Sequence, residues 1–292
     1  MRCRKLLFCC VVLAAVLYWV LPGAGGVAQE AGGEVRLIMQ GDDMGAAHGV
    51  NVGTLQAYKE GILRATNVLT PAPWMPEAAR MLNENPGLDA GVHLTLTSEW
   101  ETIKWRPLTP GRTLTDANGY FFRMVQPLKG SPGNSVVEAK PDLAEIEREL
   151  RAQIEMAKRM VPHISYLSSH MGFTSYSPAV RDLVARLAKE YKLATSGPEL
   201  GIQSLGRVWD AKDGAEARAE KLAAKLATLG PGTYLSIEHC ATDTPEVRAM
   251  GENVAFDRSA VVAAWSHPKV LEAVRKHGIR LTSYRELLAA RR

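Results

Sequence analysis

Gln40-Gly41-Asp42-Asp43-Met44-Gly45, directly after the apolar run that begins at Val35, is the stretch of this chain that decides its fold. Two later stretches repeat its design, an apolar run that ends in a polar residue and a turn: Gly91-Val-His93-Leu-Thr-Leu-Thr97 and Tyr166-Leu-Ser-Ser-His170-Met-Gly172. Parallel strands that end in polar residues bring those side chains together at one edge of a sheet. The three stretches therefore predict one shared site on a parallel sheet.

Runs of β-forming residues recur along the chain and alternate with helical patterns. The expected strands are Val35–Gln40, Ala65–Leu69, Ala90–Leu96, Ile164–Ser168, Leu193–Ser196, Tyr234–Ile237 and Ile279–Thr282. The expected helices are Ala46–Glu60, Met75–Asn85, Asp142–Met160, Pro178–Tyr191, Ala215–Leu229 and Val261–His277. This alternation predicts an α/β fold, a distorted (β/α) barrel of about seven parallel strands with a site at the C-terminal strand ends.

One segment, residues 98–140, interrupts this alternation. It contains aromatic side chains among Pro, Gly and Thr without a clear period, and it is too long for an ordinary loop. Because it follows the strand that carries His93, we expect it to lie over the predicted site. Its rings could stack on the apolar faces of sugars, or they could simply pack the segment over the barrel mouth. The substrate-binding candidates in it are Trp100, Trp105 and Phe121.

The N-terminal residues 1–29 have the pattern of an export signal. Arg2, Arg4 and Lys5 precede an apolar run over residues 6–21, and small residues follow it. We therefore expect a single domain over residues 30–292, located in the periplasm or outside the cell. The alternative is an uncleaved membrane anchor, since the sixteen apolar residues are just short of the usual spanning length.

The composition excludes two classes of protein. Removal of residues 1–29 takes away three positive and no negative charges, so the formal net charge falls from +4 to +1 and no basic patch predicts nucleic-acid binding. Three of the four cysteines, Cys3, Cys9 and Cys10, lie in the same segment. Only Cys240 remains, so we expect no disulfide framework.

Two histidines and one carboxylate form the candidate metal-binding set. Asp43, His93 and His170 suit a divalent transition metal and leave coordination positions open for water and substrate. Asp42, whose side chain diverges from that of Asp43 at a strand end, is the candidate general base toward metal-bound water. An isolated Asp-Asp-x-Gly is more often a turn, and a single buried histidine is more often a core residue. The prediction therefore depends on the joint occurrence of the three stretches.

The predicted strand Tyr234–Ile237 is followed by Glu238 and His239. His239 is therefore expected on the same face of the barrel. It is the candidate general acid that protonates a departing amine. Cys240 follows it directly, so the two side chains point in different directions and a thiol mechanism is not expected. The other histidines fall in helical or linking segments and are expected as surface or capping residues: His48, His163, His267 and His277.

In their order along the chain, the three motifs resemble those of the YdjC-like (ChbG/HpnK) carbohydrate deacetylases, relatives of the polysaccharide deacetylases. The similarity continues through Phe256-Asp257-Arg258 and residues 278–284. The resemblance implies a distorted α/β barrel, a magnesium or zinc ion, and hydrolysis of an N-acetyl group on an amino-sugar glycan. It also implies the site roles of the matching residues: metal ligands Asp43, His93 and His170, base Asp42 and acid His239.

The chain departs from this family pattern in two places. Ser168 and Gly172 stand where the family often has Asp and a second His, and Cys240-Ala241 stands where it has Pro-Gly. Two further interpretations remain open besides a deacetylase or another metal-dependent hydrolase of envelope carbohydrate. The same ligand set holds iron in oxygenases, although no His-x-Asp pair of the usual kind is present. Alternatively, the aromatic segment could bind envelope glycans without turnover.

Overall fold

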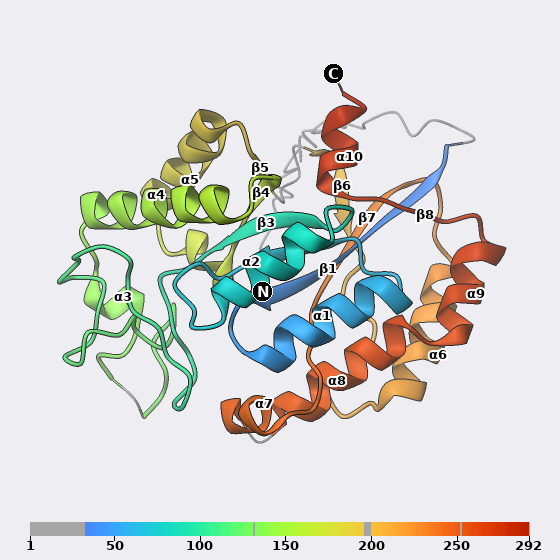
Figure 1. Cartoon of the computed structure of the whole chain (residues 1–292), viewed down its shortest axis with the longest axis horizontal. Helices are drawn as coiled ribbons and strands as arrows, with labels where there is room; N and C mark the ends of the chain where they lie inside the picture. The colour runs from blue at the N-terminus through green and yellow to red at the C-terminus, as the bar shows by residue number, and fades with distance from the viewer. Residues whose placement is uncertain (1–32, 131, 196–199, 252, 292) are drawn as a thin grey trace, which may run out of the picture.

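A parallel β-sheet organises the computed structural model, which describes residues 33–130, 132–195, 200–251 and 253–291 (Figure 1). Its strands are β1 Val35–Met44, β2 Ala65–Val68, β3 Asp89–Leu94, β4 Ile164–Ser169, β5 Ala194–Thr195, β6 Ile202–Ser204, β7 Gly232–His239 and β8 Arg280–Leu281. The expected export signal, residues 1–29, lies outside the described residues and stays a prediction. Within the described part of the chain, no helix combines the length and hydrophobicity needed to cross a membrane.

The strand order is β5-β4-β3-β2-β1-β7-β6, and β8 pairs with the N-terminal half of β1. Every pairing of these strands is parallel. The sheet curls into a half-barrel around the long central strand β1 (Figure 1). The α/β distorted barrel expected from the sequence is therefore confirmed, and its parallel order carries the C-terminal ends of β1, β3, β4 and β7 to one edge.

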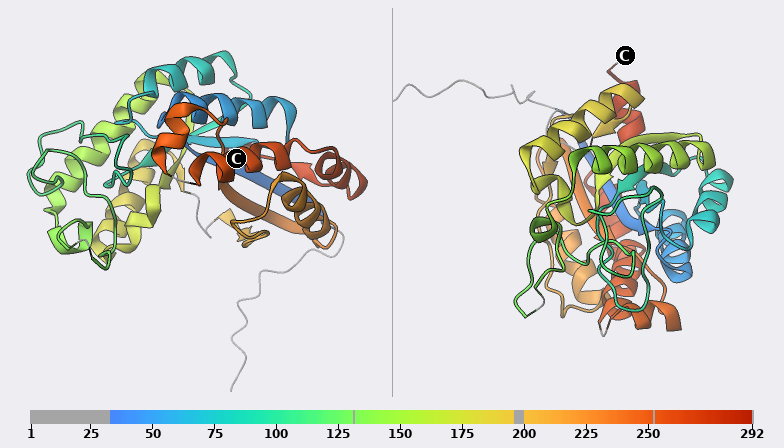
Figure 2. Two further views of the ribbon diagram at one scale, coloured as in Figure 1. Left: turned by 90° about the horizontal axis from the view of Figure 1, so that it is seen from below. Right: turned by 90° about the vertical axis from the view of Figure 1, so that its left-hand side faces the viewer.

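Helices and connecting segments cover the sheet (Figures 1 and 2). They are α1 His48–Glu60, α2 Met75–Glu84, α3 Val136–Ala139, α4 Leu143–Met160, the 3-10 helix η1 His170–Ser175, α5 Pro178–Tyr191, α6 Ala215–Leu226, α7 Pro245–Met250, α8 Val254–Trp265, α9 Pro268–Lys276 and α10 Tyr284–Ala289. Helix α4 shows how the sequence determines such an element. Its N-cap Asp142 accepts hydrogen bonds from the backbone N–H groups of Ala144 and Glu145, and its apolar stripe is buried.

One expected helix is divided in two. The sequence pattern predicted a single helix over Val261–His277, whereas α8 ends at Trp265 and α9 begins at Pro268. Proline has no backbone N–H to donate and its ring blocks the preceding turn, so it can begin a helix but cannot continue one. The His267 side chain caps the new helix by accepting from the backbone N–H of Lys269, which agrees with its expected capping role.

Alternation along β1 separates two apolar clusters. Leu37 and Met39 belong to the large core under the covering helices, whereas Ile38 faces a smaller cluster inside the half-barrel. Tyr166 of β4 and Tyr284 of α10 fill that inner cluster, with their ring centroids 4.2 Å apart. The inner cluster closes the N-terminal end of the half-barrel, so the polar strand ends lie above a packed apolar floor.

The insertion, defined as residues 98–140, lies beside α4 and α5 at one end of the molecule, as both views show (Figures 1 and 2). Two carboxylates of α4 hold it: Glu149 accepts from the backbone N–H groups of Leu108 and Thr109, and Glu145 accepts from that of Thr113. On the other side the Thr102 hydroxyl donates to a backbone carbonyl of α7. The insertion therefore extends from α4 to α7 across the face where the strands end.

Candidate metal centre

Strand β1 ends in a turn that separates the directions of its two aspartates. Asp42 is still paired in register with His239 of β7, whereas Asp43 has a φ of +70° and Gly45 a φ of +101°. Asp is among the few non-glycine residues that adopt this left-handed conformation readily. The Asn51 side chain of α1 fixes the turn by accepting from the Gly45 backbone N–H at 2.7 Å.

The three expected ligands come together beneath this turn. Oδ1 of Asp43 lies 3.2 Å from Nδ1 of His170 and 3.5 Å from Nε2 of His93. All three residues are buried, and one potential ligand atom from each lies within 4.8 Å of the others. Residues from β1, β3 and the position after β4, at least 50 positions apart in sequence, therefore form one cluster.

This cluster fits a divalent cation. Oδ1 of Asp43 is buried and accepts no hydrogen bond, although two ring nitrogens face it. An unsatisfied buried carboxylate oxygen is costly, and a cation held among the three atoms would satisfy it. Two imidazole nitrogens and one carboxylate oxygen are a donor set typical of catalytic transition-metal sites.

Each ligand is held by a further residue on its other side. Ser168 Oγ lies 3.2 Å from Nδ1 of His93, and the guanidinium of Arg258 donates to Oδ2 of Asp43 at 2.8 Å. On His170, Nε2 lies 3.0 Å from Oε2 of Glu99. Sequence reasoning missed Glu99 and Arg258, because one lies in the aperiodic insertion and the other inside helix α8.

The surrounding charges favour a cation at this point. Burial and the neighbouring His170 lower the pKa of His93 to about 3. Burial would lower the pKa of His170 as well, but Glu99 and Asp43 outweigh it and raise that pKa to about 10. Burial would raise the pKa of Asp43, yet the Arg258 guanidinium and His239 hold it well below its usual range. The position between Asp43 and His170 therefore stabilises positive charge.

Asp42 is oriented separately from the ligands. The side-chain amides of Gln40 and Asn67 both donate to its Oδ1 at 2.7 Å, and Gln40 in turn accepts from the Tyr284 hydroxyl at 2.7 Å. This leaves Oδ2 free of these bonds, 3.6 Å from Nε2 of His93. Burial raises the pKa of Asp42, which strengthens a carboxylate as a proton acceptor.

His239 lies at the accessible side of the cluster. Its Nε2 is 3.7 Å from Oδ2 of Asp43, and its side chain is 42% exposed, whereas the three candidate ligands are buried. Cys240, the next residue, is completely buried, and burial raises the pKa of its thiol. The structure therefore brings His239 to the site and keeps the Cys240 thiol neutral and out of reach.

The three aromatic candidates of the insertion are buried in the core. The ring centroids of Trp100 and Trp105 are 5.5 Å apart, and that of Trp105 is 6.0 Å from His170. Phe121 belongs to the same apolar core, and among the described residues its ring makes no aromatic contact with His93 or His170. In this structure the rings pack behind the site and present no open face to a ligand.

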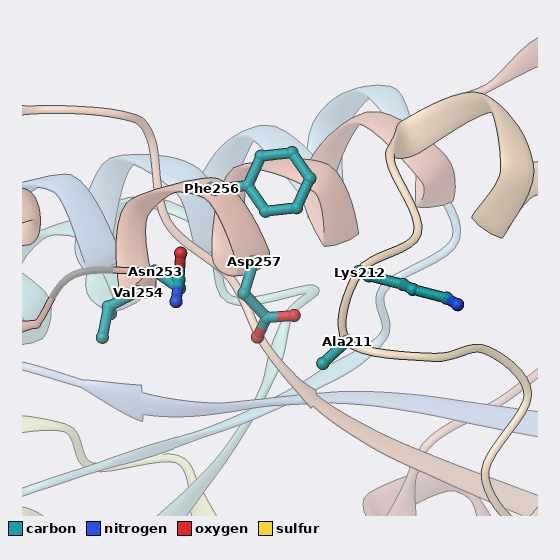
Figure 3. Close-up of a pocket in the computed structure, with 6 residues that line it drawn as sticks. All are labelled: Ala211, Lys212, Asn253, Val254, Phe256 and Asp257. Carbon is teal, nitrogen blue, oxygen red and sulfur yellow. The ribbon is translucent and has the colours of Figure 1, made fainter.

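An exposed aromatic ring lies elsewhere, at the start of α8. Phe256 is 49% exposed and borders a hollow of about 520 Å³ together with Ala211, Lys212, Asn253, Val254 and Asp257 (Figure 3). The buried guanidinium of Arg218 joins the two walls, since it donates to the Asp257 carboxylate and to the backbone carbonyl of Ala211. The two walls of the hollow are therefore linked by hydrogen bonds, and the residue after Asp257 is the Arg258 that contacts Asp43.

Comparison with known proteins places the chain in a family. The model for "YdjC-like protein" matches residues 36–276. A carbohydrate deacetylase from Thermus thermophilus is 32% identical over 278 residues, which cover 88% of this chain and 96% of that protein. Carbohydrate deacetylase 1 from Listeria innocua is 35% identical over 158 residues, 54% of this chain and 58% of that protein.

The fold also has a solved counterpart. A crystal structure from Enterococcus faecalis, of a protein described as a candidate for cellobiose-phosphate cleavage, has a TM-score of 0.71 and 23% identity, and the match covers 87% of this chain and 99% of that one. The likeness supports the half-barrel architecture. Because the family model matches residues 36–276, a range that includes Asp43, His93 and His170, this chain belongs to the YdjC-like protein family.

Proposed function

We propose that this protein is a metal-dependent carbohydrate deacetylase that hydrolyses the N-acetyl group of an amino-sugar glycan. The observation that carries the proposal is the buried, unsatisfied Oδ1 of Asp43 facing His93 and His170, beside a separately oriented Asp42. A relative that aligns with nearly the whole chain is named a carbohydrate deacetylase. The geometry and the relatives thus point to the same class of reaction.

The donor set indicates which metal fits and what it would supply. Asp43, His93 and His170 would hold the ion, which would polarise the acetamide carbonyl and provide an activated water near neutral pH. Imidazole nitrogen suits zinc better than magnesium, which prefers an all-oxygen environment. Of the two ions expected for this chain, we therefore propose zinc.

Asp42 and His239 would perform the proton transfers. Oδ2 of Asp42 would accept a proton from the attacking water as its oxygen bonds to the acetamide carbon. His239, on the accessible side, would donate a proton to the amide nitrogen as the carbon–nitrogen bond breaks, which releases acetate and the free amine. The Gln40 and Asn67 amides keep Asp42 in place because both bind the oxygen that does not accept the proton.

A surface hollow beside α8 supports the proposed substrate class. The hollow beside α8 combines the exposed ring of Phe256 with the Asp257 carboxylate, and sugars bind through such an apolar face and hydroxyl acceptor. We propose that it holds a sugar unit next to the one that is deacetylated. The expected export signal would bring the protein to envelope or environmental glycans.

Acetate release tests the proposed function. The purified protein would be incubated with N-acetylglucosamine oligomers, peptidoglycan fragments and O-acetylated sugars, first with a chelator and then with zinc, magnesium, cobalt or nickel restored. We expect release that the chelator abolishes and zinc restores, and a loss of it in His93→Ala. His277→Ala, a substitution at the C-terminal end of α9, is the matched control and should retain the activity. Metal-independent release, or an unaltered rate in His93→Ala, would contradict the proposal.

A further inference from the structure

The outer side of His170 is occupied by a carboxylate from the insertion. Oε2 of Glu99 lies 3.0 Å from Nε2 of His170, while Nδ1 of the same ring faces Oδ1 of Asp43 at 3.2 Å. An ionised carboxylate can only accept a hydrogen bond, so Nε2 must carry the hydrogen. When a cation takes the place of the second ring proton, the lone pair of the neutral ring is then on Nδ1, directed at the place where the cation fits.

We propose that Glu99 is a positioning residue that fixes the orientation and tautomer of His170, so that the insertion is a structural part of the metal centre. This inference rests on the metal-dependent function proposed above. It assigns to residues 98–140 a role that differs from covering or binding the substrate. Among the described residues, the Glu99 carboxylate contacts His170 but neither Asp43 nor His93. Replacement of Glu99 should therefore weaken metal binding through His170.

The main chain of Glu99 is itself held in place. The Arg123 guanidinium donates from Nε to the Glu99 carbonyl at 3.0 Å. On the residue before it, Ser98 Oγ accepts from the Trp105 backbone N–H at 3.1 Å, and the Trp105 indole donates to the Thr97 carbonyl at 2.9 Å. A carboxylate on such a braced segment loses little conformational entropy when it binds an imidazole.

Aromatic residues of the insertion also connect His170 with the ligand Asp43. Trp105 packs edge-on against His170, Trp100 packs edge-on against Trp105, and the Arg258 guanidinium lies 5.2 Å from the Trp100 ring centroid. Arg258 then donates to Oδ2 of Asp43 at 2.8 Å. The buried aromatic residues thus link His170 with Asp43 through a continuous series of contacts.

Zinc affinity of the full-length protein tests the proposal. Isothermal titration with zinc in a competing chelator would compare the wild type with Glu99→Ala and Glu99→Gln. Loss of an outer partner of a ligating histidine typically weakens metal binding about 10- to 100-fold, and we expect Glu99→Ala in that range. Glu99→Gln should fall between it and the wild type, because a neutral amide oxygen still accepts from Nε2 but more weakly.

Glu101→Gln is the matched control. Glu101 is two residues further along the same segment, and its side chain is 71% exposed. It pairs with Nη1 of Arg123 and not with a ligand, so Glu101→Gln leaves the Nε of Arg123 that holds the Glu99 carbonyl in place. Its zinc affinity should equal that of the wild type. The absorption spectrum of the cobalt-substituted protein gives a second readout, since a reoriented His170 changes the ligand field in Glu99→Ala but not in Glu101→Gln.

The outcomes separate this inference from the proposed function. A wild type that binds no divalent metal would overturn both. A wild type that binds zinc, with equal affinity in Glu99→Ala and Glu99→Gln, would overturn the role of Glu99 alone. An equal loss in Glu101→Gln would also overturn it, because the cause would then be the insertion as a whole. If circular dichroism shows that Glu99→Ala does not fold, the affinity and spectrum of Glu99→Gln decide.

Discussion

Asparagine substitutions at Asp42 and Asp43 should separate catalysis from metal binding, although the two residues are adjacent. Asp42→Asn keeps an oxygen that can accept from Gln40 and Asn67, so the fold should be preserved. It removes the carboxylate oxygen that we propose as the proton acceptor. Asp43→Asn keeps the left-handed turn, which asparagine tolerates, but removes the negative charge of a candidate ligand.

Asp42→Asn should lower kcat, whereas Asp43→Asn should lower zinc affinity and the free energy of unfolding. Loss of a general base lowers kcat by about 10²- to 10⁴-fold, which is roughly 3–5 kcal/mol in the activation barrier. Zinc affinity of Asp42→Asn should stay near that of the wild type, because Asp42 is not one of the three clustered ligands. Asp43→Asn should lose zinc binding and also leave the buried Arg258 guanidinium without a negatively charged partner, which costs up to about 3–5 kcal/mol of unfolding free energy.

Three assays on the same preparations check this: kcat for acetate release at saturating zinc, zinc affinity by isothermal titration, and unfolding free energy from urea denaturation. The wild type provides the reference, and Asp182→Asn on α5 controls for a loss of charge away from the site. The reasoning is refuted if both variants lose zinc affinity to the same degree. It is also refuted if Asp42→Asn retains a wild-type kcat.

Four further results are expected. Cys240→Ala should retain acetate release because the buried thiol is neutral, and a large loss of kcat would contradict this. Burial and Asp257 raise the pKa of Glu238 from 4.5 to about 7, so the folded state keeps this proton at a pH where the unfolded chain has released it. The free energy of unfolding should therefore fall as the pH rises from 4.5 to about 7. Urea denaturation of Glu238→Gln should show a smaller fall over the same pH range. Gly53→Ala should lower the unfolding free energy by about 1–3 kcal/mol, because its Cβ would lie 2.4 Å from the Ala241 backbone, whereas Gly214→Ala meets open space and serves as the control. Phe256→Ala should raise KM for oligosaccharides without changing kcat, and an equal rise in KM for Leu143→Ala, another exposed apolar residue, would refute a sugar-binding role for the hollow.

Much of the site could be predicted because its ligands lie at strand ends. Asp43 and His93 lie near the C-terminal ends of β1 and β3, and His170 directly follows β4. Parallel pairing carries such positions to one edge whatever the intervening segments do. The pairing of Asp42 with His239 in β1 and β7 is of the same kind. The division between α8 and α9 also had a local signal, Pro268, which the apolar periodicity outweighed in the prediction.

Other features depend on contacts between segments that have no fixed relation in sequence. Glu99 and Arg258 reach the ligands because the aperiodic insertion and helix α8 pack against the strand ends. No local pattern marks Glu99, and the resemblance that includes Arg258 indicated no role for it. The same packing buries Trp100 and Trp105 behind His170, where the sequence alone left open whether they face a sugar or the core.

By itself, the sequence determined the distorted α/β barrel of parallel strands and the edge at which Asp43, His93 and His170 meet, because strand periodicity and strand-end residues are local properties. Only the tertiary structure decided which ring nitrogen of each histidine faces Asp43, which residues hold those rings, and which aromatic ring remains exposed. These properties arise from side-chain packing across distant segments, where hydrogen-bond geometry and burial are set by neighbours that the local sequence does not specify.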